Sequence, residues 1–155
     1  MTLAPPELEH VCDLAVSISV PVEIGLTPAG VRRIIPITGG RVSGPRLQGK
    51  ILDCGADFQL ILGEGTQAHL DARYVIEATD GALIFVQNRA LRFTSLENSQ
   101  RIIRAEPVDP LEVYFRCQPR LESASPAWRW LHESQFIGTG RRATDGVFLS
   151  FYRVM

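Results

Sequence analysis

The chain has 155 residues, a formal net charge of −1, and hydrophobic residues at 45% of its positions. This length fits one domain with a single core, and the composition excludes a disordered chain. The near-neutral charge excludes the broad basic surface of a non-specific nucleic-acid binder, so we expect no nucleic-acid partner. Thirteen Gly and ten Pro predict many turns, which favours β structure.

The first third of the chain is predicted to be extended. Apolar residues alternate from Asp13 to Ile24, which predicts a long strand with one buried face. Because Pro21 cannot donate a backbone hydrogen bond, we expect this strand to lie at an edge of the sheet or to bend at Pro21. Residues 27–30 form a turn, and a second extended segment follows from Val31 to Thr38. We interpret Gly39-Gly40 as a structural turn or bulge rather than a phosphate site, because the Gly-rich stretch lacks a P-loop or dinucleotide pattern.

Two hairpins are predicted in the middle of the chain. Residues 57–62 and 68–79 both alternate and are joined by a Gly-rich turn, which predicts the first hairpin. Within the second segment, Leu70, Ala72, Tyr74, Ile76 and Ala78 share its apolar side. The dipeptide Asp80-Gly81 predicts the next turn, after which residues 82–87 return antiparallel.

The last third mixes loop, helix and strand. The weak pattern of residues 88–110 predicts an exposed basic loop or short helix, and strand character resumes over 111–117. A short helix begins after Ser125, and the final strands begin near Phe136 and Val147. The chain is therefore predicted to be all-β and mainly antiparallel, with one or two short helices and a sheet that closes into a barrel to remove its edges.

Several motifs together resemble the DUF3237 family, also called UPF0311. They occur in the family's order over most of the chain: Gly30–Gly40, Gly44-Pro45 with Gly49, Gly55-Ala56-Asp57, Asp71-Ala72-Arg73-Tyr74, Asp80-Gly81-Ala82, Tyr114-Phe115-Arg116, Pro119, Glu122 and Trp130-Leu131. The resemblance implies a compact, calycin-like closed β-barrel without an established biochemical role. We therefore expect residues 1–155 to form a single β-barrel domain.

The candidate catalytic residues are Asp57 and Arg73, each beside a predicted turn. In a barrel cavity, Arg73 would bind a ligand carboxylate or enolate, and Asp57 would orient it or act as a general base. Tyr74 would donate a hydrogen bond to the ligand. The alternative is a cross-strand ion pair that fixes the register of the barrel. Further candidate ligand-binding residues are Arg33, Tyr74, Tyr114 and Trp130.

Strand geometry limits this hypothesis, because Arg73 and Tyr74 are adjacent and face opposite sides of a regular strand. One arrangement has Tyr74 inside the barrel and Arg73 outside. The other has a polar lumen that contains Asp57 and Arg73, and we favour it because charged residues beside glycine turns are often functional.

A cofactor and a metal ion are not expected. His10 with Cys12 and His69 with Asp71 each share a strand face, but no third ligand lies nearby. No apolar run has the length of a membrane helix, and residues 1–10 do not resemble a signal peptide, so we expect a cytoplasmic protein with no membrane partner. The odd number of cysteines indicates free or buried thiols.

The leading functional hypothesis is a small-molecule-binding barrel that binds or transforms a small carboxylate-bearing or aromatic ligand. Its chemistry would be proton transfer, hydrolysis or cyclisation. The alternative is a structural module whose filled barrel serves oligomerisation. A cavity on the order of 300 Å³ or more would favour the first hypothesis. Under both hypotheses we expect a homo-oligomer, because the apolar strand faces exceed what one short helix covers.

Overall fold

The computed structural model describes residues 1–104 and 106–155, which form one ten-stranded sheet with short helices. The strands are β1 (Leu8–Ile18), β2 (Val22–Thr27), β3 (Gly30–Ser43), β4 (Gly49–Ile51), β5 (Gly55–Leu62), β6 (Gln67–Ala78), β7 (Leu83–Phe93), β8 (Tyr114–Ser123), β9 (Gln135–Ala143) and β10 (Gly146–Val154). The α-helix is α1 (Leu96–Ile103), and the 3-10 helices are η1 (Gly63–Gly65), η2 (Pro110–Glu112) and η3 (Pro126–Leu131).

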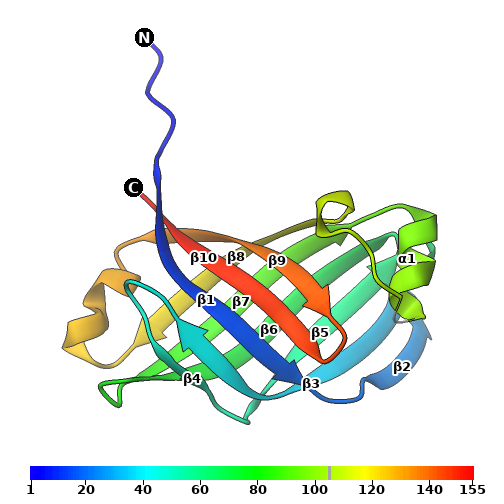
Figure 1. The fold of residues 1–155 in the computed structure, drawn as a ribbon, viewed down its shortest axis with the longest axis horizontal. Coiled ribbons are helices and arrows are strands. Elements are labelled where there is room, and N and C mark those ends of the chain that lie inside the picture. The colour runs from blue at the N-terminus through cyan, green and yellow to red at the C-terminus, as the bar shows by residue number, and fades with distance from the viewer. Residues whose placement is uncertain (105) are drawn as a thin grey trace.

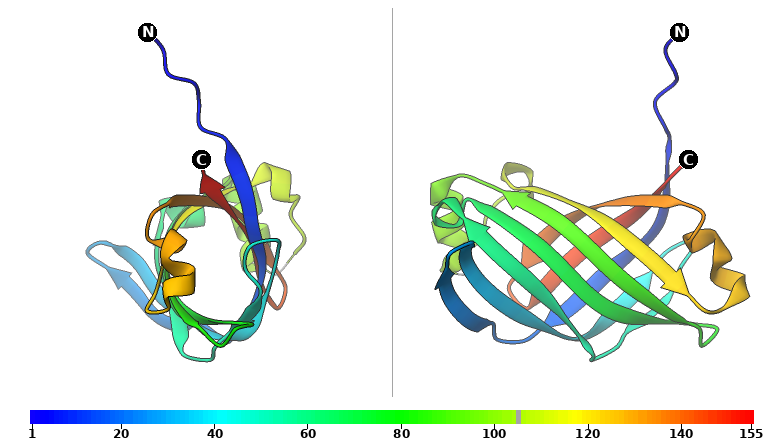
Figure 2. Two further views of the ribbon diagram at one scale, coloured as in Figure 1. Left: turned by 90° about the vertical axis from the view of Figure 1, so that its left-hand side faces the viewer. Right: turned by 180° about the vertical axis from the view of Figure 1, so that it is seen from behind.

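The sheet closes into an eight-stranded antiparallel barrel (Figures 1 and 2). Closure occurs at β1, which pairs with β10 on one side and with β3 on the other. The short β4 and the longer β5 follow one another between β3 and β6, so together they occupy one place in the ring. Strand β2 pairs with β3 outside the ring. The prediction of a closed antiparallel barrel is confirmed.

Gly40 allows β3 to pass close to β1. Its φ is +147°, and a Cβ atom at this position would collide with the carbonyl oxygen of Ala15 on β1. Gly39 and Gly40 are therefore strand residues rather than a turn. The predicted bulge lies beside them, where the β1–β3 register shifts between Ser17 and Ile18.

Two predicted elements have different limits in the structure. The predicted strand 13–24 is divided into β1 and β2, because residues 19–21, which include Pro21, leave the ladder. The predicted loop 88–110 is wrong in its first part, because β7 continues to Phe93. This continuation carries the inward-facing side of β7 as far as Arg92, which is buried.

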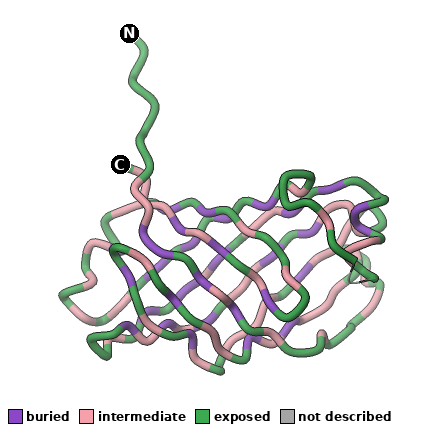
Figure 3. Tube along the Cα trace, viewed as in Figure 1, coloured by how far each residue is buried: buried purple, intermediate pink, exposed green. Residues whose placement is uncertain are grey.

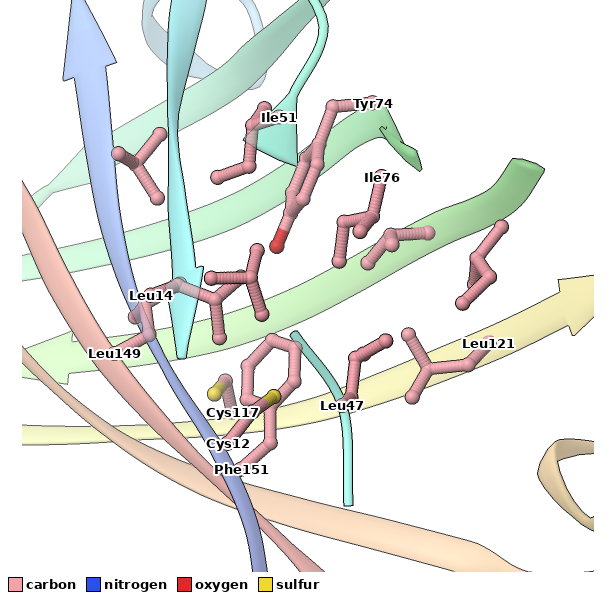
Figure 4. Close-up of a cluster of buried hydrophobic side chains, with 14 of the residues drawn as sticks. Cys12, Leu14, Leu47, Ile51, Tyr74, Ile76, Cys117, Leu121, Leu149 and Phe151 are labelled. Carbon is pink, nitrogen blue, oxygen red and sulfur yellow. The ribbon is translucent and has the colours of Figure 1, made fainter. Parts of the chain in front are cut away.

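The core lies inside the barrel, where buried residues alternate with exposed ones along the strands (Figure 3). Tyr74 and Phe151 are its largest fully buried side chains (Figure 4). One end of the barrel carries α1 and β2, and the opposite end carries η3 (Figures 1 and 2). None of the described helices is long and apolar enough to cross a membrane.

Candidate functional site

The register between β5 and β6 decides which side chains enter the barrel. Asp57 stands opposite Ala72, and Arg73 stands opposite Ala56. Directly paired residues of antiparallel strands project to the same face, so Asp57 shares the inner face with Ala72 and Tyr74. The lumen therefore contains both Asp57 and Tyr74. Tyr74 lies inside as in the first predicted arrangement, and Asp57 lies inside as in the second.

Arg73 lies on the outer face, and the expected polar lumen with Asp57 and Arg73 is wrong. Its side chain is 53% exposed and forms an ion pair of 3.2 Å with Asp71 on the same strand. Gln87 of β7 donates a hydrogen bond of 3.2 Å to the other oxygen of Asp71. Because β6 has no bulge at this point, the alternation of the strand separates Arg73 from Asp57.

An inner cavity of about 60 Å³ adjoins Asp57. Its walls are mostly apolar, and the small side chains of Ala72 and Ala90 leave the space open. Polar side chains from four strands reach this cavity: Asp57 and Gln59 from β5, Tyr74 from β6, Asn88 and Arg92 from β7, and Arg142 from β9. The cavity is therefore a confined space in which several hydrogen-bonding groups converge.

One oxygen of the Asp57 carboxylate is fixed by the protein and the other is not. Oδ2 accepts a hydrogen bond of 2.6 Å from the Gln59 amide. Oδ1 is buried and has no hydrogen-bond partner within residues 1–104 and 106–155. Burial raises the pKa of Asp57 above its usual value, although the Gln59 hydrogen bond, the backbone of Asp71 and the positive charges of Arg92 and Arg33 oppose the rise. This carboxyl can therefore exchange a proton nearer to neutral pH than an exposed aspartate.

Tyr74 and Asn88 also present buried oxygen atoms without partners. The Tyr74 side chain points from β6 into the lumen, with its hydroxyl directed toward the centre of the barrel (Figure 4). In the described part of the chain, neither Tyr74 Oη nor Asn88 Oδ1 has a hydrogen-bond partner, and both residues line the inner cavity. Burial is the main cause that raises the pKa of Tyr74 well above 10, so its hydroxyl stays protonated and can donate a hydrogen bond.

A wider space, which we call the vestibule, lies at the barrel end that carries α1 and β2. Its volume is about 720 Å³, and its lining includes Arg33, Arg92 and Arg142. Arg92 and Arg142 also line the inner cavity, so these two arginines stand between the two spaces. Arg33 lines the vestibule and donates a hydrogen bond of 2.7 Å from Nε to Gln59. The inner cavity is smaller than the expected ligand site, whereas the vestibule exceeds it.

Two of the predicted ligand-binding residues lie away from the inner cavity. Tyr114 is exposed and out of phase with the buried Phe115 on β8, and it lines an open outer groove of about 1050 Å³. Trp130 lies in η3, where it packs on Phe136 with a ring separation of 5.9 Å. The guanidinium groups of Arg46 and Arg153 lie over the Trp130 ring at 5.0 and 5.7 Å. Trp130 is thus part of the packing at the end opposite the vestibule.

Sequence reasoning missed four residues of the site, namely Gln59, Asn88, Arg92 and Arg142. A signal was available in β7, because Asn88 and Arg92 follow Ile84 and Val86 at even spacing and so belong to the same face. Arg142 likewise shares the parity of the buried Phe136 on β9. In the described part of the chain, no three His, Cys, Asp or Glu side chains are grouped to hold a metal ion.

Comparisons with known proteins agree with this fold. The model of a family described as "Protein of unknown function (DUF3237)" matches residues 6–154. A UPF0311 protein of Rhodopseudomonas palustris (strain TIE-1) is 40% identical over 149 residues, which cover 96% of this chain and 97% of that protein. The crystal structure of a conserved protein of unknown function from Rhodopseudomonas palustris matches with a TM-score of 0.92 at 37% identity, over 99% of this chain and 100% of that one. An enzyme from Penicillium herquei matches with a TM-score of 0.75 at 19% identity, over 100% of this chain and 98% of that one, which shows a shared fold alone.

Proposed function

The chain belongs to the DUF3237 family, and we propose that its barrel binds a small organic molecule and transforms it by proton transfer, hydrolysis or cyclisation without a cofactor. One observation carries this proposal. Asp57 Oδ1, Tyr74 Oη and Asn88 Oδ1 are buried without hydrogen-bond partners among the residues that the structure describes, and all three residues line the same cavity. Unpartnered buried polar atoms destabilise a fold, so their convergence indicates groups kept for a ligand.

The three groups have complementary roles toward a ligand in this cavity. Asp57 acts as the general base through Oδ1, because the Gln59 hydrogen bond at Oδ2 holds the carboxylate in one orientation. Tyr74 donates a hydrogen bond to a ligand oxygen on which negative charge develops. Asn88 accepts a hydrogen bond from the ligand through Oδ1. In proton transfer or cyclisation, the proton that Asp57 removes returns to a second atom of the same ligand. In hydrolysis, Asp57 takes the proton from the attacking water molecule and returns it to the leaving group of the bond that breaks. None of these steps requires an oxidant or reductant.

The comparison with the Penicillium herquei enzyme supports this reading at the level of the fold. That protein has the same barrel architecture and is an enzyme, so a barrel of this kind accommodates catalysis. The choice of Asp57 and Tyr74 for this chain rests on their own burial and missing partners.

Isotope exchange tests the proposed function. The protein is incubated in D₂O with a panel of small ketones, lactones and organic acids, and proton NMR follows both exchange of C–H protons and formation of new products. We expect turnover by the natural chain and its loss in Asp57→Asn. Ala72→Val, which fills the cavity and leaves every polar group in place, is expected to reduce turnover as well. Unchanged turnover in Asp57→Asn contradicts the proposed function.

A second candidate function is a module that assembles through β2, and one observation favours it. Val22, Ile24 and Leu26 of β2 are 56%, 56% and 83% exposed, and β2 pairs with β3 along one edge only. The other edge offers free backbone groups to the β2 of a second copy. Sedimentation of the natural chain and of Leu26→Asp tests this assembly. A monomeric natural chain at working concentration contradicts it.

A further inference from the structure

Three arginines converge on the boundary between the inner cavity and the vestibule. Arg33, Arg92 and Arg142 come from β3, β7 and β9, and all three line the vestibule. Burial is the main cause that lowers the pKa of Arg92 and of Arg142, and repulsion among the three arginines lowers both further. Strands far apart in the sequence therefore concentrate positive charge at one place inside the barrel.

This charge is not balanced by the protein. Arg92 is only 7% exposed, and neither Arg92 nor Arg142 forms a hydrogen bond or ion pair through its side chain with any described residue. Burial, followed by repulsion from Arg142 and Arg33, lowers the pKa of Arg92 to about 10, which still leaves it charged at neutral pH. A buried charge without a partner is costly, so its presence indicates a binding partner outside the chain.

The nearby acidic residues do not supply this partner. Asp57 is the acidic residue of the inner cavity, and its Oδ2 is bonded to Gln59. Glu23 and Glu64 line the vestibule, but neither forms an ion pair with an arginine within residues 1–104 and 106–155. Three positive groups thus face one carboxyl whose pKa burial raises, and the boundary carries a net positive charge.

The surfaces on either side of the arginines define the shape of an anion that would fit there. The inner cavity of about 60 Å³ admits only a few atoms. The vestibule is more than large enough for a small organic body, and its walls include the apolar side chains of Ile61, Leu62, Ile102 and Ile103. An arginine guanidinium matches a carboxylate with two parallel hydrogen bonds. The surroundings therefore fit an amphipathic organic acid.

We propose that the ligand of this barrel is an organic acid whose carboxylate binds to Arg33, Arg92 and Arg142, and whose apolar body lies in the vestibule under α1. This inference rests on the proposed function, because it names the class of molecule that the same site accepts. The bound carboxylate places the atoms next to it at the inner cavity, within reach of Asp57 and Tyr74. The three arginines thereby position the ligand, and Asp57 remains the group that exchanges protons with it.

Binding of three matched probes tests the inference. Benzoate, benzamide and phenyl phosphate share an aromatic body and differ in the head group, and calorimetry or NMR titration measures their affinities for the full chain. We expect benzoate to bind at least about tenfold more tightly than neutral benzamide. Equal affinity for benzamide overturns the proposal. Tighter binding of phenyl phosphate also overturns it, because the head group is then a phosphate.

Arginine variants locate the bound carboxylate. Arg142→Gln and Arg92→Gln are each expected to weaken benzoate binding at least about tenfold while leaving benzamide binding unchanged. The matched control is Arg89→Gln on the exposed outer face of β7, which is expected to bind benzoate like the natural chain. Because Arg142 is exposed, we expect its variant to fold even if replacement of the buried Arg92 disturbs the barrel. Unchanged benzoate affinity in Arg142→Gln and in a folded Arg92→Gln overturns the proposal.

Asp57→Asn separates the failure of this inference from the failure of the proposed function. If the inference holds, Asp57→Asn binds benzoate at least as tightly as the natural chain, because one nearby negative charge is removed. If neutral molecules are turned over in an Asp57-dependent way and the arginine variants have no effect, the inference fails alone. If benzoate binds through the arginines but Asp57→Asn retains full turnover of organic acids, the proposed function fails alone.

Discussion

Gln59 donates a hydrogen bond of 2.6 Å to Oδ2 of Asp57, and this bond fixes the orientation of the carboxylate that lines the inner cavity. The Oε1 atom of the same amide accepts a hydrogen bond of 2.7 Å from Arg33 Nε. A carboxylate only accepts and a guanidinium only donates, so the amide has one possible orientation. Gln59 thereby holds Asp57, the proposed base, at a fixed distance from Arg33 of the vestibule, and it leaves Oδ1 of Asp57 facing the inner cavity.

Replacing Gln59 is expected to disturb both neighbours. In Gln59→Leu, Asp57 Oδ2 and Arg33 Nε lose their partners, which is expected to lower the free energy of unfolding by about 1–3 kcal/mol. The pKa of Asp57 is expected to rise further, because the Gln59 hydrogen bond lowers it. Denaturant unfolding and NMR titration of the carboxyl carbon measure the two effects. Gln87→Leu on the outer face is the control, and an equal loss of stability in both variants contradicts the prediction.

The stability of the protein is expected to depend on pH through Asp57. The pKa of Asp57 in the folded state is raised above 3.8, so the folded protein holds this proton more tightly than the unfolded chain does. The resulting stabilisation is fully present below pH 3.8 and is lost as the pH rises through the folded-state pKa. Asp57→Asn lacks this dependence, so it is expected to become more stable than the natural chain as the pH rises. Unfolding curves of both proteins at several pH values between about 4 and 8 give the difference. A difference that shrinks with rising pH contradicts the sign.

Tyr74→Phe is expected to separate stability from ligand binding. The hydroxyl has no hydrogen-bond partner among the described residues, so its removal is expected to change the free energy of unfolding by less than about 1 kcal/mol. Turnover or binding of a ligand in the cavity is expected to fall, because the ligand loses a donor. Thermal unfolding and the NMR assay measure the two properties. Tyr114→Phe on the exposed face of β8 should change neither, and a large loss of stability in Tyr74→Phe would show a structural role.

Gly40→Ala is expected to disrupt closure of the barrel. The new Cβ atom would collide with the Ala15 carbonyl oxygen, and the φ of +147° would strain any other residue. We expect a loss of more than about 2 kcal/mol in the free energy of unfolding. Gly81→Ala is the control, because it has a φ of +85° but open space around its Cβ position, so it reports backbone strain alone. An equal loss of the free energy of unfolding in the two variants would contradict the close packing of β1 against β3 at Gly40.

The sequence predicts the barrel better than it predicts the site. Alternation of apolar residues and the Asp80-Gly81 turn identify strands and hairpins because both are local signals. The inward position of Asp57 depends on its register opposite Ala72, which no local pattern specifies. Arg92 and Arg142 come from strands that are distant in the sequence, so their approach to Arg33 follows only from closure of the ring. Arg73 lies on the outer face because the apolar parity of β6, and not the charge of one residue, determines which side chains of this strand enter the lumen.

The pairing of β1 with β10 has a consequence for biosynthesis. The first and last strands of the ring are neighbours, so the barrel cannot close until β10 has left the ribosome. Until then, β1 lacks one partner and the inward-facing apolar residues of a growing sheet remain in contact with water. Contacts between distant strands also slow folding, so the nascent chain stays open for longer than a helical protein of similar length. Chaperones that recognise exposed strands therefore have their main opportunity to act on this protein before its last nine-residue strand is complete.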